Sequence, residues 1–218
     1  MVFMDGFLKK KMFKNIIFDW TGVVKDGLEC HLWLVNKIFK KFGAKEISLE
    51  ELKETWEQPH MGFYNKHLPN LTEEEEVEAY KEGILSRECP ESKDFPEICE
   101  FIRKLKEKDY FLGVISSDLP ETILLEIKKY GLENIFDEVI FSSADKTTSL
   151  KNMIEKFKLD PVETYFIGDS NHEIIAGKAI GVKTIAVTWG LNTKEYLKSK
   201  NPDFVVHNIK ELKNILLK

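Results

Sequence analysis

The sequence has no long apolar run and no excess of basic residues. None of its hydrophobic segments approaches the roughly 18 residues that a membrane-spanning helix needs, so we expect no membrane association. The net charge is −5 and the isoelectric point is near 5.7, which argues against a nucleic-acid partner, because proteins that follow a phosphate backbone usually carry a basic face. Residues 1–8 do not read as a secretion signal, because they are few, include Asp5 and precede their lysines. We therefore expect a cytoplasmic protein.

Cysteine is also scarce. The three cysteines are Cys30, Cys89 and Cys99, and none of them falls at a spacing typical of metal ligands. We expect all three to be small apolar residues in a reducing compartment.

Four predicted strands end in side chains that can carry chemistry. The apolar run Ile16–Phe18 is followed directly by Asp19, and continuous apolar runs are typical of strands buried on both faces of a parallel sheet. The run 111–115 is followed by the hydroxyls of Ser116 and Ser117. The run 138–141 is followed a few residues later by Lys146. The run 164–168 is followed by two acids four positions apart, Asp169 and Glu173. Because carboxyl ends of parallel strands share one sheet edge, we expect these side chains to meet there.

Strand and helix patterns alternate from about residue 95 onward, with two further strands predicted at 184–188 and 204–206. Such alternation predicts right-handed crossovers and a doubly wound, Rossmann-like parallel sheet. The predicted fold class is therefore α/β, with a core domain made of residues 1–25 and 94–218. The segment before Met12 is an N-terminal extension whose order the sequence does not decide.

Between the first strand and residue 95 the alternation gives way to helical patterns. Apolar residues from Leu28 to Phe42 recur at helical spacing and end at Gly43, while Ser48 and Thr72 each begin a capping box. We therefore predict an inserted all-helical domain of residues 26–93, with linkers near 25–27 and 90–95.

A carboxylate, a hydroxyl, a lysine and an acid pair, in this order and at strand ends, resemble the four motifs of the haloacid dehalogenase superfamily. The Gly-Asp-Ser at Gly168 and the Ile-Ile-Ala-Gly-Lys-Ala-Ile-Gly that ends at Gly181 extend the resemblance, which covers nearly the whole chain. It implies that the helical insert is a cap of the type called C1, similar to the caps of phosphoglycolate phosphatases. Such a cap closes over the active site, so we expect it to move relative to the core.

The resemblance implies a Mg²⁺-dependent phosphatase whose partner is a small phosphorylated metabolite. Asp19 would attack the phosphorus of a phosphate monoester and form an aspartyl-phosphate. The other oxygen of Asp19, the main-chain carbonyl of Thr21 and the side chain of Asp169 would hold Mg²⁺. Glu173 would complete or orient the metal shell. Most relatives carry aspartate at that position, and the longer glutamate favours a contact through water.

The remaining catalytic roles fall on the second and third motifs. Ser116 and nearby amides, including that of Ser117, would hydrogen-bond the oxygens of the transferring phosphate. Lys146 would neutralise charge between the nucleophile and the phosphate. The proline that commonly follows this lysine in relatives is Thr147 here.

Thr21 is the most consequential departure from the family pattern. Most phosphatases of the superfamily have a second aspartate at this position, and it protonates the leaving oxygen and then activates water. General acid–base catalysis contributes about 10² to 10⁴-fold to the rate, and threonine is a poor substitute. We therefore expect a slow second half-reaction.

Two other functions fit the same residues. A phosphonatase-like enzyme that cleaves a C–P bond shares the run Asp19-Trp20-X-Gly22, but its chemistry needs a cap lysine that forms a Schiff base. The candidates in the predicted cap lie among polar neighbours, and they are Lys45, Lys53, Lys66 and Lys81. A phosphate-binding protein with weak turnover is the second alternative, because of Thr21. Dehalogenation is disfavoured, because it needs no metal and would leave the acid pair without a role.

Trp20, Gln58 and His60 complete the predicted substrate-binding residues. Residues 56–62 lie between helical patterns, and Pro59 and Gly62 predict a loop that presents Gln58 and His60 to a substrate. For the oligomeric state we expect a monomer or a small homo-oligomer.

Overall fold

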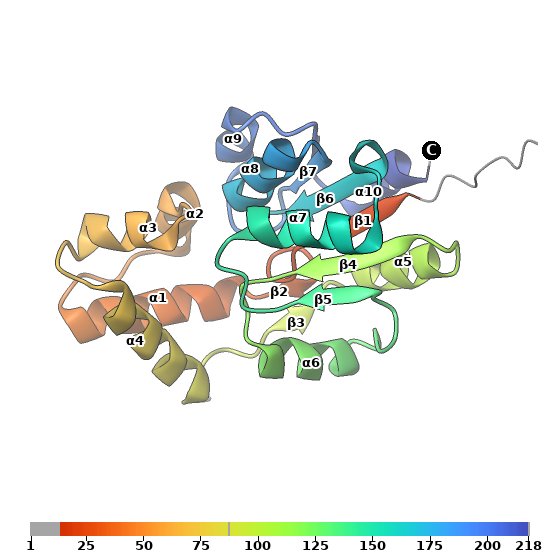
Figure 1. Cartoon of the computed structure of the whole chain (residues 1–218). Helices are drawn as coiled ribbons and strands as arrows, with labels where there is room; N and C mark the ends of the chain where they lie inside the picture. The colour runs from red at the N-terminus through yellow and green to blue at the C-terminus, as the bar shows by residue number, and fades with distance from the viewer. Residues whose placement is uncertain (1–13, 87, 218) are drawn as a thin grey trace, which may run out of the picture.

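The computed structural model describes residues 14–86 and 88–217, so the expected extension before Met12 lies outside the described residues. The core is a six-stranded sheet in the order β5-β4-β1-β6-β7-β8, and all neighbouring strands are parallel (Figure 1). The strands are β1 (Asn15–Phe18), β4 (Phe111–Ile115), β5 (Glu138–Ile140), β6 (Thr164–Gly168), β7 (Lys183–Val187) and β8 (Phe204–Val206). This confirms the predicted α/β fold with a doubly wound parallel sheet.

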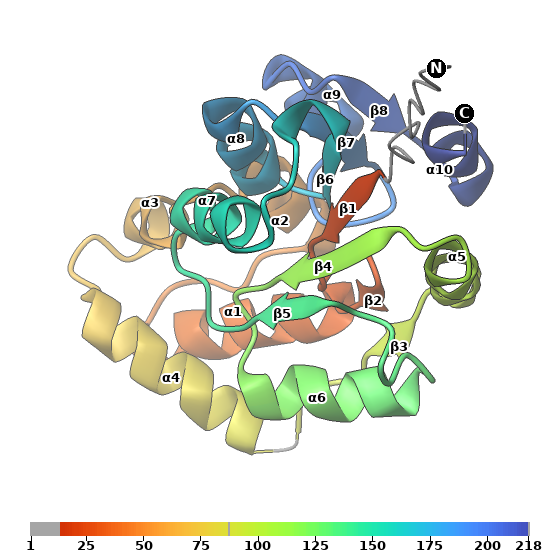
Figure 2. The same cartoon turned by 45° about the vertical axis from the view of Figure 1, so that its right-hand side comes forward.

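Helices cover both faces of this sheet (Figure 2). One face packs against α5 (Pro96–Lys106), α6 (Pro120–Lys129) and α10 (Ile209–Leu216), and the other against α7 (Lys146–Phe157) and α8 (Asn171–Ile180). The short elements η1 (Pro161–Glu163) and α9 (Lys194–Ser199) precede β6 and follow β7. Ile16 and Phe18 of β1 pack on the first face and Ile17 on the second, and all three are fully buried. Burial on both faces explains why the strand is apolar from Ile16 to Phe18.

The sheet is built outward from β1 in two directions. β4 and β5 lie on one side of β1, and the chain then returns to place β6, β7 and β8 on its other side. Doubly wound proteins bind ligands at such a switch point, in the crevice outside the carboxyl ends of the strands. Figure 1 shows β4 and β5 pointing with these ends toward the helices of the insert.

The insert after β1 consists of helices with an apolar cluster of their own. The helices are α1 (Leu28–Phe42), α2 (Leu49–Thr55), α3 (His60–His67) and α4 (Glu73–Leu85). Phe39, Trp56 and Phe63 lie at the centre of the cluster, with Phe63 in ring contact with both of the others. The insert therefore buries an apolar cluster of its own, and Leu191 of the core domain also packs against it.

Three of these helices end or begin at the predicted signals. Gly43 ends α1 in the left-handed conformation with a φ of 84°, the Ser48 side chain accepts the Glu51 amide of α2, and Thr72 forms a complete capping box with Glu75. These contacts satisfy backbone groups that a helix end leaves without partners.

Helix α3 corrects the expectation of a loop over residues 56–62. It begins at His60, directly after Pro59, and Gly62 lies inside its first turn. Phe63 and Tyr64 of this helix are buried in the insert's cluster. Their packing outweighs the weak helix preference of glycine, and tertiary packing of this kind is not visible in a local pattern.

The two connections between insert and core run side by side. β2 (Lys25–Asp26) and β3 (Lys93–Asp94) form an antiparallel pair, with Lys25 opposite Asp94 and Asp26 opposite Lys93. Both lie within the linkers expected from the sequence. The domain bounds drawn there stay a prediction.

A disulfide bond joins the chain just beyond this pair of strands. Cys30 of α1 and Cys89, which follows α4, are bonded, and their Cα atoms are 5.3 Å apart. This corrects the expectation of three unbonded cysteines, while Cys99 is free and buried as expected. The bonded pair is 59 residues apart in sequence, so no local spacing indicated it. Across residues 14–86 and 88–217 no helix is long and apolar enough to cross a membrane.

Candidate active site

Four predicted side chains meet at the carboxyl edge of the sheet. Asp19 follows β1, Lys146 is the first residue of α7, Asp169 follows β6, and Glu173 lies in the first turn of α8. The Nζ atom of Lys146 is 2.7 Å from Oδ1 of Asp19, and it also pairs with Glu173. Carboxylate oxygens of Asp19, Asp169 and Glu173 lie within 4.8 Å of one another. All four side chains are buried.

Two glycines let the backbone approach Asp169 closely. A Cβ atom on Gly22 would lie 1.8 Å from Oδ2 of Asp169, and one on Gly190 would lie 2.3 Å from the same oxygen. Gly22 also has a φ of 81°, which favours glycine. The amide of Leu191 donates to this oxygen over 2.7 Å, so the loop after β7 fixes the carboxylate.

Glu173 is held by the start of its own helix. The Ser170 amide and hydroxyl donate to Oε2 of Glu173 over 3.1 and 2.8 Å, which completes a capping box for α8. Its other oxygen, Oε1, pairs with Lys146. Both oxygens therefore have protein partners, and the side chain is well placed to orient Lys146.

The cluster holds more acid than base. Burial, together with the charge of Glu173, raises the pKa of Asp19 to about 7 against the attraction of Lys146. Burial and the neighbouring charges of Asp19 and Glu173 also raise the pKa of Asp169. Burial opposes a charge on Lys146 as well, but Asp19 and Glu173 outweigh it and raise the pKa of the lysine. Three buried carboxylates thus face one ammonium group.

This donor set fits a divalent cation such as Mg²⁺. Magnesium prefers carboxylate oxygens and retained waters, and a cation would relieve the excess negative charge among the three acids.

The predicted hydroxyl residues Ser116 and Ser117 follow β4, the strand next to β1 in the sheet. Ser116 is almost fully buried, and its Oγ accepts the amide of Asp118 over 3.1 Å, which leaves its own hydrogen available to another acceptor. The Ser117 hydroxyl instead donates to the carbonyl of Ser143 over 3.0 Å. Its side chain therefore fixes the loop, while its amide role stays a prediction.

Thr21 takes part in a network that the sequence did not reveal. Its hydroxyl donates to Oδ2 of Asp118 over 2.7 Å, and the Nζ atom of Lys25 lies 2.8 Å from the same oxygen. Lys25 also lies 3.2 Å from Oε1 of Glu126. The turn that follows β1 makes this possible, because the Trp20 carbonyl accepts the amides of residues 23, 24 and 25 and folds the chain back.

Burial and the neighbouring charges shift the pKa values of this network in opposite directions. Burial disfavours a charged Asp118, but Lys25 outweighs it and lowers the pKa of this carboxyl. Burial also opposes the charge on Lys25, and Asp118 and Glu126 together raise its pKa. Asp118 directly follows the predicted Ser116 and Ser117, and that position was the one available signal for it.

Trp20, which the sequence predicted to bind substrate, packs inside the core, and its role toward a substrate stays a prediction. Its side chain is fully buried, stacks on Tyr130, and donates from Nε1 to Glu126 over 2.6 Å. It therefore fixes the loop after Asp19. The large apolar ring is more stable in the core than at a water-filled site.

Gln58 and His60 lie in the insert at the side that faces α8. The Gln58 carbonyl accepts Nδ2 of Asn171 over 3.3 Å, and the Trp56 carbonyl accepts Nδ2 of Asn192 over 3.1 Å, so this segment contacts the core. The Nε2 atom of His60 lies 3.3 Å from Oε2 of Glu76. Their role toward a substrate stays a prediction.

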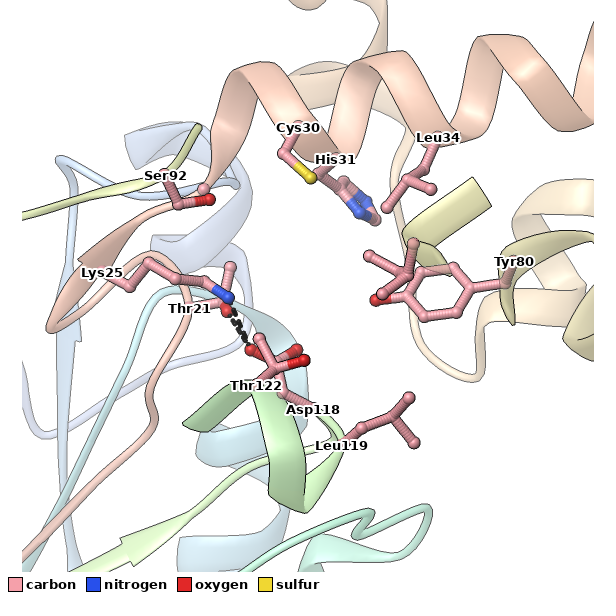
Figure 3. A pocket seen from close by; sticks show the side chains of 12 residues that line it. Thr21, Lys25, Cys30, His31, Leu34, Tyr80, Ser92, Asp118, Leu119 and Thr122 are labelled. Carbon is pink, nitrogen blue, oxygen red and sulfur yellow. Dashed lines mark hydrogen bonds and ion pairs between the residues drawn. The ribbon is translucent and has the colours of Figure 1, made fainter. Parts of the chain in front are cut away.

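A cavity of about 60 Å³ lies between the core and the insert. Figure 3 shows Lys25, Thr21 and Asp118 on its core side, with His31 and Tyr80 opposite them. Leu119 and Thr122, at the start of α6, close the lower wall in this view. None of the four clustered side chains lines the cavity, but Thr21 follows Asp19 by two residues, and the charge of Lys146 helps to lower the pKa of the Asp118 carboxyl at the cavity wall.

His31 allows a test of the burial of this cavity. Burial lowers the pKa of its imidazole to about 4, from 6.5 in an exposed chain. Between pH 6.5 and 4 the His31 imidazole is therefore protonated in the unfolded chain but not in the folded chain. A fall in pH through this range lowers the free energy of unfolding. We expect a loss of about 1.4 kcal/mol per pH unit from this residue between pH 6.5 and 4. Urea unfolding of wild type and His31→Gln at several pH values measures it. Parallel pH curves for the two proteins would contradict the burial.

Comparison with known proteins agrees with this geometry. A parallel sheet carries a buried carboxylate, lysine and acid pair at its carboxyl edge, which is where α/β proteins place their functional sites. The family model named haloacid dehalogenase-like hydrolase matches residues 16–187, and the chain belongs to this family. It is therefore a hydrolase with phosphatase-like relatives, as the sequence motifs predicted.

The relatives cover nearly the whole chain. Pyrophosphatase PpaX of Oceanobacillus iheyensis is 24% identical over 210 residues, which are 93% of this chain and 96% of the relative. Phosphoglycolate phosphatase of Haemophilus influenzae is 26% identical over 221 residues, with 94% and 98% covered. A haloacid dehalogenase-like family hydrolase from Streptococcus pneumoniae has the same fold, with a TM-score of 0.79, 20% identity, and 94% and 98% covered.

Proposed function

We propose that this protein is a Mg²⁺-dependent phosphatase that hydrolyses a small phosphate monoester through an aspartyl-phosphate on Asp19. The observation that carries the proposal is the buried cluster of Asp19, Lys146, Asp169 and Glu173 at the carboxyl edge of the sheet. The names of the relatives, a pyrophosphatase and a phosphoglycolate phosphatase, support a phosphoryl substrate. The cytoplasmic location expected from the sequence belongs to the same proposal.

Asp19 is the nucleophile in this reaction. One of its oxygens attacks phosphorus, and the bond between phosphorus and the leaving alcohol breaks as the new P–O bond forms. Lys146, 2.7 Å from Oδ1 of Asp19, orients the carboxylate and neutralises charge on the transferring group. Water then attacks the phosphorus, which releases phosphate and restores Asp19.

Other residues support these two steps. Asp19, Asp169 and the Thr21 carbonyl would hold Mg²⁺, with Glu173 held close by through Ser170 and Lys146. When bound, the metal neutralises charge on the phosphate oxygens. The Ser116 hydroxyl, whose hydrogen is not used within the loop, donates to one of these oxygens. Thr21 carries no acidic or basic group, so the leaving oxygen takes its proton from solvent in the first step, and the attacking water gives its proton to solvent in the second.

The phosphonatase alternative finds little support in the positions of the lysines. Lys45, Lys66 and Lys81 of the insert are exposed, and Lys53 is half-buried and does not line the cavity. Lys25 does line the cavity, but Asp118 and Glu126 raise the pKa of its amine. A protonated amine cannot attack an aldehyde to form a Schiff base.

Removal of the metal tests the proposal against a protein that merely binds phosphate. We expect chelation with EDTA to lower phosphate release at least about 100-fold, because a metal supplies several kcal/mol of charge stabilisation, and Mg²⁺ should restore it. Asp169→Asn should raise the Mg²⁺ concentration needed for half-maximal activity. The matched control Asp160→Asn changes an exposed residue before η1, where asparagine caps as well as aspartate. Undiminished activity after chelation would contradict the metal's role.

A further inference from the structure

The cavity beside Thr21 carries an uneven balance of charge. The single ammonium group of Lys25 faces two carboxylates, at 2.8 Å from Oδ2 of Asp118 and 3.2 Å from Oε1 of Glu126. Their side chains are only 8%, 17% and 14% exposed, so solvent screens them weakly. Of the described residues that line the cavity, Lys25 is the only one with a positive charge, and it is already paired. One negative charge is therefore left beside the cavity.

Two atoms at the cavity wall have room for a hydrogen-bond partner. Thr21 and Lys25 both donate to Oδ2 of Asp118, and among the described residues no donor is hydrogen-bonded to its Oδ1. The Nε2 atom of His31 is buried and has no hydrogen-bond partner within the described chain. A buried polar atom without a partner is costly, and a ligand that supplies the missing hydrogen removes this cost.

We propose that this cavity receives the leaving alcohol of the substrate and selects one that bears an ammonium group. The substrate is then a phosphate monoester of a short amino alcohol. This inference rests on the proposed phosphatase function, because it assigns the leaving-group side of the same site. Thr21 links the two parts, since its hydroxyl lies at the cavity and its backbone follows the nucleophile by two residues.

The size and the walls of the cavity fit such a group. One water molecule needs about 10–15 Å³ of cavity volume. The cavity of about 60 Å³ therefore has room for roughly four to six non-hydrogen atoms. An ammonium group there can donate to Oδ1 of Asp118 and to Nε2 of His31 when that nitrogen is unprotonated. The aromatic ring of Tyr80, on the opposite wall, is a surface that attracts cations. A carboxylate in the same place would meet Asp118 and no free cation.

The test compares three esters of nearly equal size, namely O-phosphoethanolamine, n-propyl phosphate and 2-phosphoglycolate. We expect kcat/KM to fall in this order by roughly tenfold at each step. A single weakly screened charge a few ångströms from the bound group changes its binding by about this factor. The selectivity should be seen in kcat/KM, because hydrolysis of the aspartyl-phosphate is common to all three esters and limits kcat. An ammonium ester that does not exceed the propyl ester would overturn the proposal.

Two variants change the charge balance in different ways. Asp118→Asn removes the excess charge and should reduce the preference for the ammonium ester over 2-phosphoglycolate about tenfold or more. Thr122→Lys adds a cation at a half-exposed wall position and leaves the buried network intact, so it should fold even if the first variant does not, and it should shift selectivity in the same direction. Asp160→Asn is the matched control and should keep the wild-type order. Wild-type selectivity in both cavity variants would overturn the proposal.

A binding measurement separates this inference from the proposed reaction. Calorimetric titration of Asp19→Asn with the three esters and Mg²⁺ reports their dissociation constants without turnover, and the same order is expected. If the wild type released no phosphate from any of these esters or from p-nitrophenyl phosphate, the phosphatase proposal would be wrong. The order of the dissociation constants would still decide whether the cavity prefers the ammonium group.

Discussion

Asp19→Asn is expected to lower phosphate release at least about 10⁴-fold, to a rate close to that without protein. The amide cannot form the aspartyl-phosphate, and loss of a nucleophile is typically among the largest single-residue effects in an enzyme. The asparagine side chain keeps nearly the same volume as aspartate at this buried position, so we expect the fold to survive. Phosphate release from p-nitrophenyl phosphate with Mg²⁺, measured beside circular dichroism of both proteins, checks both statements.

The control Asp160→Asn separates the chemistry from a general effect of the substitution. This residue lies before β6, at the amino end of the strand and therefore at the edge opposite to the acidic cluster. Its activity should equal that of the wild type. If Asp19→Asn retained substantial activity while Asp160→Asn was unchanged, another residue would have to be the nucleophile.

The second large effect concerns the acid–base function that Thr21 lacks. A carboxylate at position 21 should raise turnover by up to about 10² to 10⁴-fold, the usual contribution of general acid–base catalysis. The structure adds a condition, because the Thr21 hydroxyl lies 2.7 Å from Oδ2 of Asp118. A new carboxylate there would meet a like charge, which disfavours its ionised form. We therefore expect Thr21→Asp alone to gain little, and Thr21→Asp combined with Asp118→Asn to gain most.

Steady-state turnover of p-nitrophenyl phosphate by the wild type, the two single variants and the double variant measures this coupling. The leaving group of this ester needs little protonation, so a gain reports on hydrolysis of the aspartyl-phosphate. Asp118→Asn alone controls for the loss of the Asp118 charge. Equal turnover in the double variant and the wild type would show that position 21 does not limit the reaction.

Much of the fold was predictable because its signals are local. The strands are centred on short apolar runs, and their positions agree with the runs in the sequence, from Ile16 in β1 to Val206 in β8. Helix caps at Gly43, Ser48 and Thr72 were equally visible, since each depends on residues within one turn. The parallel sheet followed from the alternation of these elements.

The acidic cluster was predictable for a different reason. Asp19 and Asp169 each follow a strand directly, and parallel strands bring such positions to one edge whatever their distance in sequence. Lys146 and Glu173 lie in the first turns of the helices that follow, so the same topology places them. The catalytic roles of these residues stay predictions until activity is measured.

The features that the sequence did not reveal depend on long-range packing. Lys25 and Asp118 are 93 residues apart and meet because the turn after β1 folds back on itself. The bond between Cys30 and Cys89 depends on the two connections of the insert running side by side. Neither the spacing of apolar residues nor a helix cap indicates such contacts. From the sequence alone, a lysine in a linker is therefore expected to be a solvated charge.

The central claim is that Asp19 carries the phosphoryl group between two chemical steps, and the first turnover tests it directly. The measurement is an acid-quenched time course with p-nitrophenyl phosphate and Mg²⁺, in which p-nitrophenol, phosphate and the phosphorylated protein are each quantified, and the modified peptide is identified by mass spectrometry. We expect a burst of p-nitrophenol equal to the enzyme concentration, slow release of phosphate, and a phosphoryl group on Asp19. A single slow phase, with phosphate appearing together with p-nitrophenol and no phosphorylated Asp19 at any time, would contradict the account.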